Sequence, residues 1–286
     1  MTGTVTANGG NNSVGGLVGY ILSGTLTNAY MTGTVTATGG NNSVGGLVGT
    51  TRGPITNAYA AGSVTATGGG SRVGGLVGIN QYAGTMTNVY ATGSVFAAGN
   101  YNNVGGLAGI GAAAITNAYA AGSVTGTGTN NYVGGLLGAQ QSSLTKGYFD
   151  QTAAGTSAGA GFNSGSALIG LTTAQWASEG PTVPGSPYSF STPGDWVSGS
   201  PYPILKALPY IVIQASGTQI YGQGTATVVF NSVRDQNGLD VSGKIDTTAL
   251  SWSGTNLSAA TSVGNSAPLI IHGSVPGYQT IYTGTD

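Results

Sequence analysis

The first half of the chain repeats one pattern five times: a Gly-Thr/Ser-Val segment, a glycine- and asparagine-rich stretch, VGGL, a variable stretch and a TNAY-like close. The VGGL runs begin at Val14, Val44, Val73, Val104 and Val133, and the closing tyrosines are Tyr30, Tyr59, Tyr90, Tyr119 and Tyr148. A unit of 29 to 31 residues cannot bury a hydrophobic face alone, so such units must stack on one another. The pattern therefore predicts a solenoid.

Length variation is confined to one part of the repeat. Each closing tyrosine precedes the next VGGL valine by 14 residues, as from Tyr30 to Val44, whereas the distance from that valine to its own tyrosine varies. The variable stretches are YILSG, TTRG, INQYAG, IGAA and AQQSS. Because insertions in solenoids collect in loops on one face, often the binding face, we expect any recognition edge here.

The strand candidates in each repeat predict an all-β fold, a parallel β-helix of five three-stranded coils. In Thr4-Val5-Thr6 the threonines face one way and the valine the other, which is the pattern of a half-buried strand. VGGLVG is apolar at both parities, so periodicity alone leaves open whether Leu17 or the pair Val14 and Val18 points inward. The paired asparagines, as in Asn41-Asn42 or Asn102-Asn103, suit left-handed turn positions.

Stacked coils place equivalent side chains in columns along the axis. We expect the five closing tyrosines to stack, and the asparagines two residues earlier to form an amide ladder of Asn28, Asn57, Asn88 and Asn117. Lys146 occupies the fifth position of that ladder. A charge is costly inside a continuing column, so we expect the stack to end there.

Three domains are expected. The repeats form a solenoid over 1–148, and residues 149–205 form a cap and linker in which Leu171–Trp176 is the chain's only short helix, with Thr172 or Thr173 as N-cap. Residues 206–286 read as an antiparallel β module, a small β-sandwich or a β-grasp-like fold. Because the array opens directly on a repeat strand, we expect flanking domains of a larger parent protein.

Charge and composition exclude several classes of function. The chain has six basic and seven acidic residues, and every acidic residue lies at or beyond Asp150, while only Arg52 and Arg72 are charged before Lys146. Such a surface is a poor partner for nucleic acid or anionic lipid, and no apolar run is long enough for membrane insertion. With no cysteine, one histidine and no carboxylate pair in the repeats, we predict no enzyme, no metal and no cofactor.

The run VGGLVG followed by a Thr-Asn-Ala-Tyr close resembles the GLUG repeats of large bacterial surface proteins. The segment with LTTAQW and the later YPIL resembles the end of such arrays. The region from Ile220 through Ser251-Trp-Ser253 to Tyr282 is more weakly similar to mostly-β glycine-rich (MBG-like) modules. The resemblance implies a right-handed helix in a filamentous-haemagglutinin-like adhesin on the bacterial cell surface. It implies no catalytic residues.

We therefore predict an extracellular adhesin whose variable edge contacts a glycan or protein on a host, matrix or neighbouring cell. The candidate contact residues are Tyr20, Ile21, Arg52, Gln81, Tyr82 and Gln140. One alternative is a passive stalk that projects another domain. A third reading is ice binding by a two-column hydroxyl array, Thr4/Thr6, Thr34/Thr36, Ser63/Thr65, Ser94/Phe96 and Ser123/Thr125.

Overall fold

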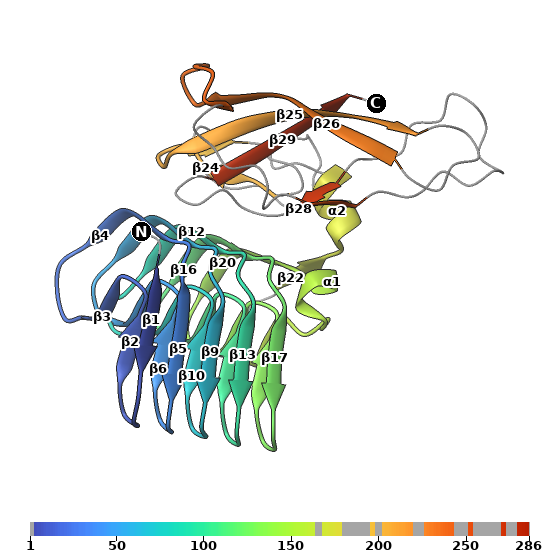
Figure 1. Cartoon of the computed structure of the whole chain (residues 1–286). Helices are drawn as coiled ribbons and strands as arrows, with labels where there is room; N and C mark the ends of the chain where they lie inside the picture. The colour runs from blue at the N-terminus through green and yellow to red at the C-terminus, as the bar shows by residue number, and fades with distance from the viewer. Residues whose placement is uncertain are drawn as a thin grey trace. The chain divides into compact units, whose positions relative to one another are not determined.

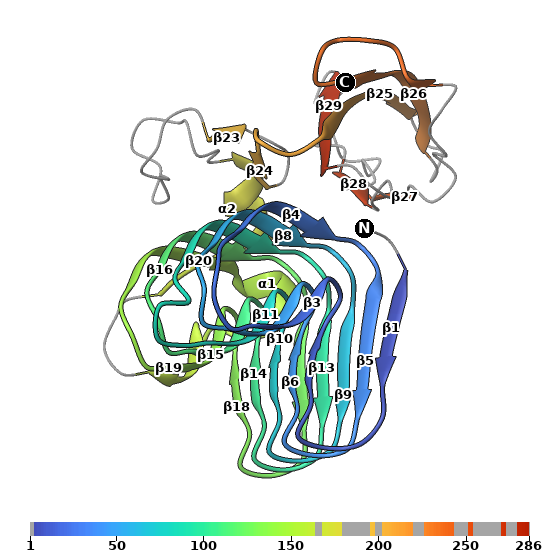
Figure 2. The ribbon, with the colours of Figure 1, turned by 90° about the vertical axis from the view of Figure 1, so that its left-hand side faces the viewer.

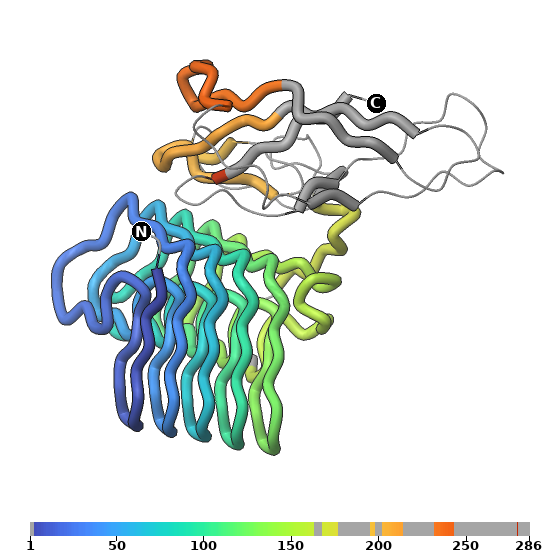
Figure 3. Tube along the Cα trace, in the orientation of Figure 1, coloured from blue at the N-terminus to red at the C-terminus, as the bar shows by residue number. Residues whose placement is uncertain are grey.

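The computed structural model describes residues 3–163, 168–178, 195–197, 202–219, 226–242, 251–253, 270–272 and 279–285 (Figure 1). Figure 3 traces the stacked coils of the first half of the chain as a tube. The chain separates into two compact units, Met1–Asp195 and Trp196–Asp286. The first unit is a parallel β-solenoid, so the expected fold is confirmed (Figure 1).

Each coil contributes four strands, one to each of four parallel sheets, rather than the three expected. The first sheet contains β1 (Thr4–Ala7), β5 (Thr34–Thr38), β9 (Val64–Thr67), β13 (Val95–Ala98) and β17 (Val124–Thr127). The second contains β2 (Ser13–Gly15), β6 (Ser43–Gly45), β10 (Arg72–Gly74), β14 (Asn103–Gly105) and β18 (Tyr132–Gly134).

The third and fourth sheets have six strands each. The third contains β3 (Val18–Ile21), β7 (Val48–Thr51), β11 (Val77–Asn80), β15 (Ala108–Gly111), β19 (Leu137–Gln140) and β21 (Ala160–Asn163). The fourth contains β4 (Leu26–Met31), β8 (Ile55–Ala60), β12 (Met86–Ala91), β16 (Ile115–Ala120), β20 (Leu144–Asp150) and β22 (Ile169–Leu171). Figure 2 shows strands of each sheet stacked behind one another.

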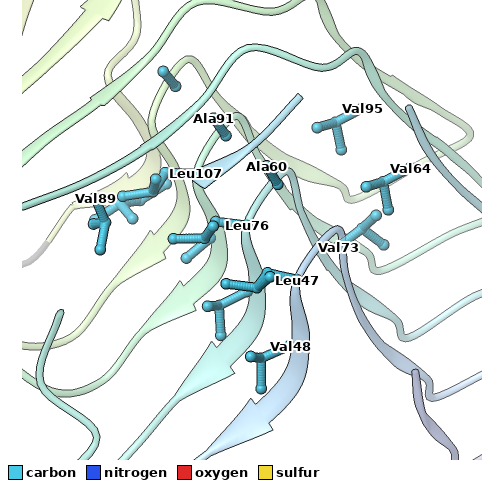
Figure 4. Packing of buried hydrophobic residues seen from close by; sticks show 14 of the residues in the cluster. Leu47, Val48, Ala60, Val64, Val73, Leu76, Val89, Ala91, Val95 and Leu107 are labelled. Carbon is cyan, nitrogen blue, oxygen red and sulfur yellow. The ribbon is translucent and has the colours of Figure 1, made fainter. Parts of the chain in front are cut away.

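The fourth strand arises because VGGLVG folds as two short strands with a bend at the second glycine and the leucine. Val44, Leu47 and Val48 all enter the core, since the bend interrupts the alternation of a single strand (Figure 4). Periodicity alone left open whether the leucine or the two valines of VGGLVG point inward, and in this coil all three do. The core continues with columns of valine and alanine from the first sheet, such as Val64 and Ala66.

The glycine in each third-sheet strand, just after the bend, lets the second and third sheets touch through their backbones. A Cβ on Gly78 would lie 2.5 Å from the oxygen of Gly49 and 2.6 Å from the nitrogen of Val44. Contacts below 3.0 Å with backbone atoms cannot be relieved by a rotamer change. Only glycine therefore fits this column.

The turn between the first and second sheets holds a second asparagine ladder. The backbone N–H of Asn12 donates to Oδ1 of Asn42 at 2.8 Å. The series continues through Ser71, Asn102 and Asn131 at 2.7 to 3.2 Å. The left-handed positions are Asn11, Asn41, Gly70, Tyr101 and Asn130. The expectation for Asn102-Asn103 was therefore wrong, because Tyr101 takes the positive φ and frees Asn102 for the ladder.

The last coil is closed by the segment after Tyr148. Helix α1 (Gln151–Ala154) follows Asp150, whose carboxylate caps it and also accepts the hydroxyl of Thr173 at 2.6 Å. Phe149 and Ala154 join the hydrophobic core. Of the expected cap, residues 164–167, 179–194 and 198–201 lie outside the described residues.

Leu171–Trp176 is not the chain's only short helix, because α1 precedes it. Helix α2 spans Thr173–Ser178 and its N-cap is Thr172, as expected. Thr172 Oγ1 accepts from the N–H of Gln175 at 3.2 Å, and Gln175 Oε1 accepts from the N–H of Thr172 at 2.8 Å. These two bonds form a capping box.

In the second unit, β23 (Trp196–Val197) pairs with β24 (Ile204–Leu205), and β27 (Ser251–Ser253) pairs with β28 (Ile270–His272), both antiparallel. A further sheet joins β25 (Tyr210–Gln219) to β26 (Ala226–Asp235) in antiparallel fashion and to β29 (Gln279–Thr285) in parallel. The expected antiparallel pairing is confirmed except at β29. Gln279 is buried and bonds both the N–H and the carbonyl of Leu205 at 2.7 Å, which ties β29 to β24.

We predict that Gly78→Ala lowers the free energy of unfolding of the solenoid by at least about 2 kcal/mol, because backbone atoms block the new Cβ. Gly111→Ala is the matched control, since its Cβ would lie 3.2 Å from the nearest atom, a side-chain carbon of Leu137. We expect it to change stability by less than about 1 kcal/mol. Thermal unfolding followed by circular dichroism measures the stability of both variants. Equal effects would contradict the claim that backbone atoms exclude a Cβ at Gly78.

Candidate functional site

The variable stretches all connect the third sheet to the fourth. They comprise residues 20–24, 50–53, 79–84, 110–113 and 139–143, which we call the variable edge. They begin at or near the ends of β3, β7, β11, β15 and β19. The sheets on both sides keep their register, so differences in loop length are absorbed at this edge alone.

Three candidate residues from three successive coils meet on the variable edge. The guanidinium carbon of Arg52 lies 5.7 Å from the ring centroid of Tyr20 and 4.8 Å from that of Tyr82. Both distances lie within the range of cation–π attraction. We call these residues the tyrosine–arginine cluster.

The rings of this cluster face solvent. Tyr82 is 74% exposed and Tyr20 is 42% exposed, while Arg52 is partly buried. The backbone N–H of Arg52 donates to the carbonyl of Ile21 at 2.8 Å, which fixes its base. Its Nε is buried and has no hydrogen-bond partner among the described residues, so the two rings are its main electrostatic partners there.

The remaining candidates of the variable edge lie deeper than a contact role requires. Gln140 is only 1% exposed, so its assignment to a ligand contact was wrong. Its Nε2 donates to the carbonyl of Ser142 at 3.2 Å. Ile21 is partly buried against the core, whereas Gln81 is half-buried at a turn.

Gln140 belongs to a column of buried polar side chains that the repeat pattern did not predict. The equivalent positions of the second and third coils hold Thr51 and Asn80, both fully buried, which donate to the carbonyls of Gly53 at 2.6 Å and Gly84 at 3.1 Å. Each side chain turns inward and holds its own loop. The sequence does carry a signal for this column, because the last residue of the third-sheet strand is polar in three of the five coils.

The tyrosine and asparagine columns follow the fourth sheet as predicted. The rings of Tyr30, Tyr59, Tyr90 and Tyr119 stack with centroids 4.8 to 5.3 Å apart and planes within 7° of parallel. Trp176 of α2 lies 5.3 Å from Tyr119 and 6.5 Å from Tyr148. The stack is therefore a structural column that α2 covers at its C-terminal end.

The asparagine ladder donates toward the N-terminus, with Nδ2 of Asn57, Asn88 and Asn117 each donating to Oδ1 one coil earlier, at 2.9 to 3.2 Å. All four asparagines adopt φ between 52° and 53°, and Lys146 takes φ 56° at the fifth position. The amide series ends at Lys146, although the sheet itself continues to β22. Nδ2 of Asn88 also donates to the carboxylate of Asp195 at 2.9 Å.

The family model of the GLUG motif matches residues 10–36 and 69–95. Two coils carry the GLUG motif. No curated protein and no solved structure matches the chain. The matches start in the glycine-rich turn, cross the VGGL bend and end in the first-sheet strand of the following coil, so they cover the variable edge of the first and third coils.

The hydroxyl array lies in register on the first sheet. Thr4 pairs with Thr34, Thr6 with Thr36, and Thr36 with Thr65. Phe96, which is 37% exposed, pairs with Thr65 and Thr125 and interrupts the second column. The register of the array is thus established, and ice binding stays a prediction.

In the described part of the chain, no group of three or more histidine, cysteine or acidic residues could hold a metal ion. No helix among the described residues is long and apolar enough to cross a membrane.

The asparagine ladder predicts different effects for two substitutions at Asn117. Asn117→Gly keeps the left-handed backbone and removes the side-chain hydrogen bonds, at a cost of about 1 kcal/mol. Asn117→Ala removes the same bonds and leaves in the left-handed region a Cβ without the amide that lets asparagine tolerate it, which adds about 1–2 kcal/mol. Urea unfolding of both variants measures the difference. Equal stability of the two would show that the backbone conformation is not the reason for asparagine at this position.

The tyrosine column predicts a loss of stability at alkaline pH. Burial raises the pKa of Tyr59 and Tyr90 above the ordinary value, and neighbouring tyrosines raise each further. The raised folded pKa means that this stability is complete below pH about 10 and is lost as pH rises, because unfolded tyrosines ionise first.

The test is Tyr59→Phe, since the Tyr59 hydroxyl is buried with no hydrogen-bond partner among the described residues. We expect the variant to be as stable as the parent or up to about 1 kcal/mol more stable at pH 8. At pH 11 we expect the variant to exceed the parent in free energy of unfolding by a larger amount than at pH 8. Urea midpoints at the two pH values measure this, and a constant difference would contradict the assignment.

Proposed function

We propose that this chain is part of a non-enzymatic adhesin, exported to the bacterial cell surface, and that it attaches to a glycan through the tyrosine–arginine cluster. The observation that carries the proposal is the placement of Arg52 between the rings of Tyr20 and Tyr82. Three coils contribute one residue each, so the cluster exists only when the coils are stacked.

The chemistry of the cluster suits a sugar ligand. Exposed aromatic rings offer flat apolar surfaces to the C–H faces of pyranose rings, and the guanidinium offers hydrogen-bond donors to hydroxyl or carboxylate oxygens. Aromatic and arginine side chains are also the groups that most often dominate binding energy at interfaces. A protein ligand would meet the same groups, but the cluster is small for a stable protein interface.

The variable edge itself supports a recognition role. The third and fourth sheets are held in register by the buried columns, so substitutions and insertions at the loop positions after Thr51, Asn80 and Gln140 leave the fold intact. The GLUG motif and the β-solenoid suit an extended surface protein, which supports the location at the cell surface. The competing hypothesis is a passive stalk, in which the edge has no ligand.

The test is binding of the full chain to an array of glycans and matrix proteins, with two matched variants. Tyr82→Asn removes the cluster's most exposed ring, and Tyr101→Asn removes another exposed ring elsewhere. Tyr82 and Tyr101 have φ of 55° and 61° and are 74% and 66% exposed, so asparagine suits both backbones.

We expect Tyr82→Asn to weaken glycan binding at least about tenfold and Tyr101→Asn to leave it unchanged. A chain whose five variable stretches are replaced by one uniform loop should lose binding altogether. Equal losses in both tyrosine variants would contradict the site. Absence of any ligand for the parent chain would favour the stalk.

A further inference from the structure

Two outward-facing columns run side by side along the solenoid next to the tyrosine–arginine cluster. The column of the second sheet is Ser13, Ser43, Arg72, Asn103 and Tyr132. The column of the third sheet is Tyr20, Thr50, Ile79, Ile110, Ala139 and Phe162. We call the two columns together the corner strip.

The two columns touch one another, although they leave the outer faces of different sheets. Ser13 Oγ and Thr50 Oγ1 lie 2.9 Å apart, and the rings of Tyr132 and Phe162 lie 5.5 Å apart with planes tilted by 54°. Side chains on the outer faces of two sheets can meet only if those faces turn toward each other. The second and third sheets therefore form an inward-facing corner on the surface of the solenoid (Figure 2). At the base of this corner the glycine of the third-sheet strand, such as Gly78, lies against the backbone of the second sheet.

The strip is shielded along its middle and exposed at both ends. Thr50, Ile110 and Ala139 are 3% to 9% exposed. In contrast, Tyr20 at one end is 42% exposed, and Tyr132 and Phe162 at the other end are 47% and 48% exposed. Aromatic platforms therefore bound a shallow strip of small polar and apolar side chains.

The charge of this side of the solenoid is positive and unopposed. Arg72 lies within the strip, and Arg52 lies over Tyr20 at its end. These are the only formal charges in residues 1–145, and no acidic residue precedes Asp150. A ligand carrying negative groups along its length would complement the two guanidinium groups.

We propose that the corner strip binds a linear acidic polysaccharide that lies parallel to the solenoid axis, from Tyr20 to the pair Tyr132 and Phe162. This inference rests on the proposed function and extends its site from one cluster to the length of the solenoid. Stacked coils repeat about every 4.8 Å, which is comparable to the length of one sugar residue in a linear chain. Successive sugars therefore meet equivalent positions of successive coils, and their carboxylates accept from Arg52 and Arg72.

A linear polysaccharide fits the strip better than a nucleic acid. Two arginines release few counterions, whereas binding to a phosphate backbone depends on many. The side chains of Ser13 and Asn103, which stay at least partly exposed, supply hydrogen-bond partners that match sugar hydroxyls. The shielded middle has no aromatic platform for stacked bases, which single-stranded nucleic acids require.

The experiment compares two oligogalacturonides, a trimer and a chain of about ten residues that can span five coil spacings of about 4.8 Å. Affinities for the full chain are measured by calorimetry at low and high salt. We expect the long chain to bind at least about tenfold more tightly than the trimer, because it reaches the second aromatic platform. Salt should weaken binding of the long chain more, since it meets both arginines.

The double variant Tyr132→Ala/Phe162→Ala should lose the advantage of the long chain and keep the affinity for the trimer. Arg72→Gln should also reduce that advantage, whereas Arg234→Gln, an exposed residue of the second unit, is the control for an equal change in charge. A fully methyl-esterified chain of the same length tests the need for carboxylates. A melting curve for each variant confirms that the solenoid stays folded.

Equal affinity for the short and long chains would overturn the inference, as would full binding by the methyl ester or a long-chain advantage that survives the double variant. Preference for a single-stranded RNA would overturn it as well. If another glycan binds and depends on Tyr82 while galacturonides do not bind, the corner strip fails and the proposed function stands. If no glycan binding depends on Tyr82, the proposed function fails first.

Discussion

The structure depends on parallel, in-register hydrogen bonding between successive coils. Each strand of the solenoid pairs with the equivalent strand of the next coil, so every coil must keep the same path within the spacing of neighbouring strands. Where this path brings two backbones into close contact, there is no room for a side chain. The glycine column at Gly78 and Gly49 is one such case, because its atoms lie against the backbone of the adjoining sheet.

The same stacking turns single residues into columns. A buried amide or hydroxyl in one coil would be costly, but a column supplies its partner one coil away, as Asn117 and Asn88 do at 2.9 Å. Ring stacking stabilises the tyrosine column. The buried hydroxyl of Tyr59 destabilises it, because that hydroxyl has no hydrogen-bond partner among the described residues. Where the coils need not match, at the variable edge, the chain can carry recognition residues without disturbing the stack. The tyrosine–arginine cluster and the corner strip both draw on residues that only this stacking brings together.

Much of the solenoid could be predicted from particular residues. The period of VGGL and TNAY predicted the stack, and the asparagines and tyrosines at fixed spacing predicted two columns that the structure confirms. The strand count was wrong because the bend inside VGGLVG leaves no break in the hydrophobic pattern. Gln140 was misplaced because a polar residue beside a loop looks exposed in sequence, whereas its amide bonds a carbonyl of its own loop. Likewise, Tyr101 was missed as the left-handed residue because tyrosine rarely adopts positive φ, although it stands three residues before Val104, as Asn11 does before Val14.

The sequence by itself determined the repeat, its register and the place where its length varies, because periodicity is a local property that stacking must obey. It also determined the charge balance, with two arginines and no acid before Asp150. Only the tertiary structure decided which side of each strand faces water at the bend, that Tyr20, Arg52 and Tyr82 form one cluster, and that Ser13 meets Thr50 across two sheets. These facts depend on the angle between sheets and on contacts across coils. Both are set by backbone packing that no single repeat contains.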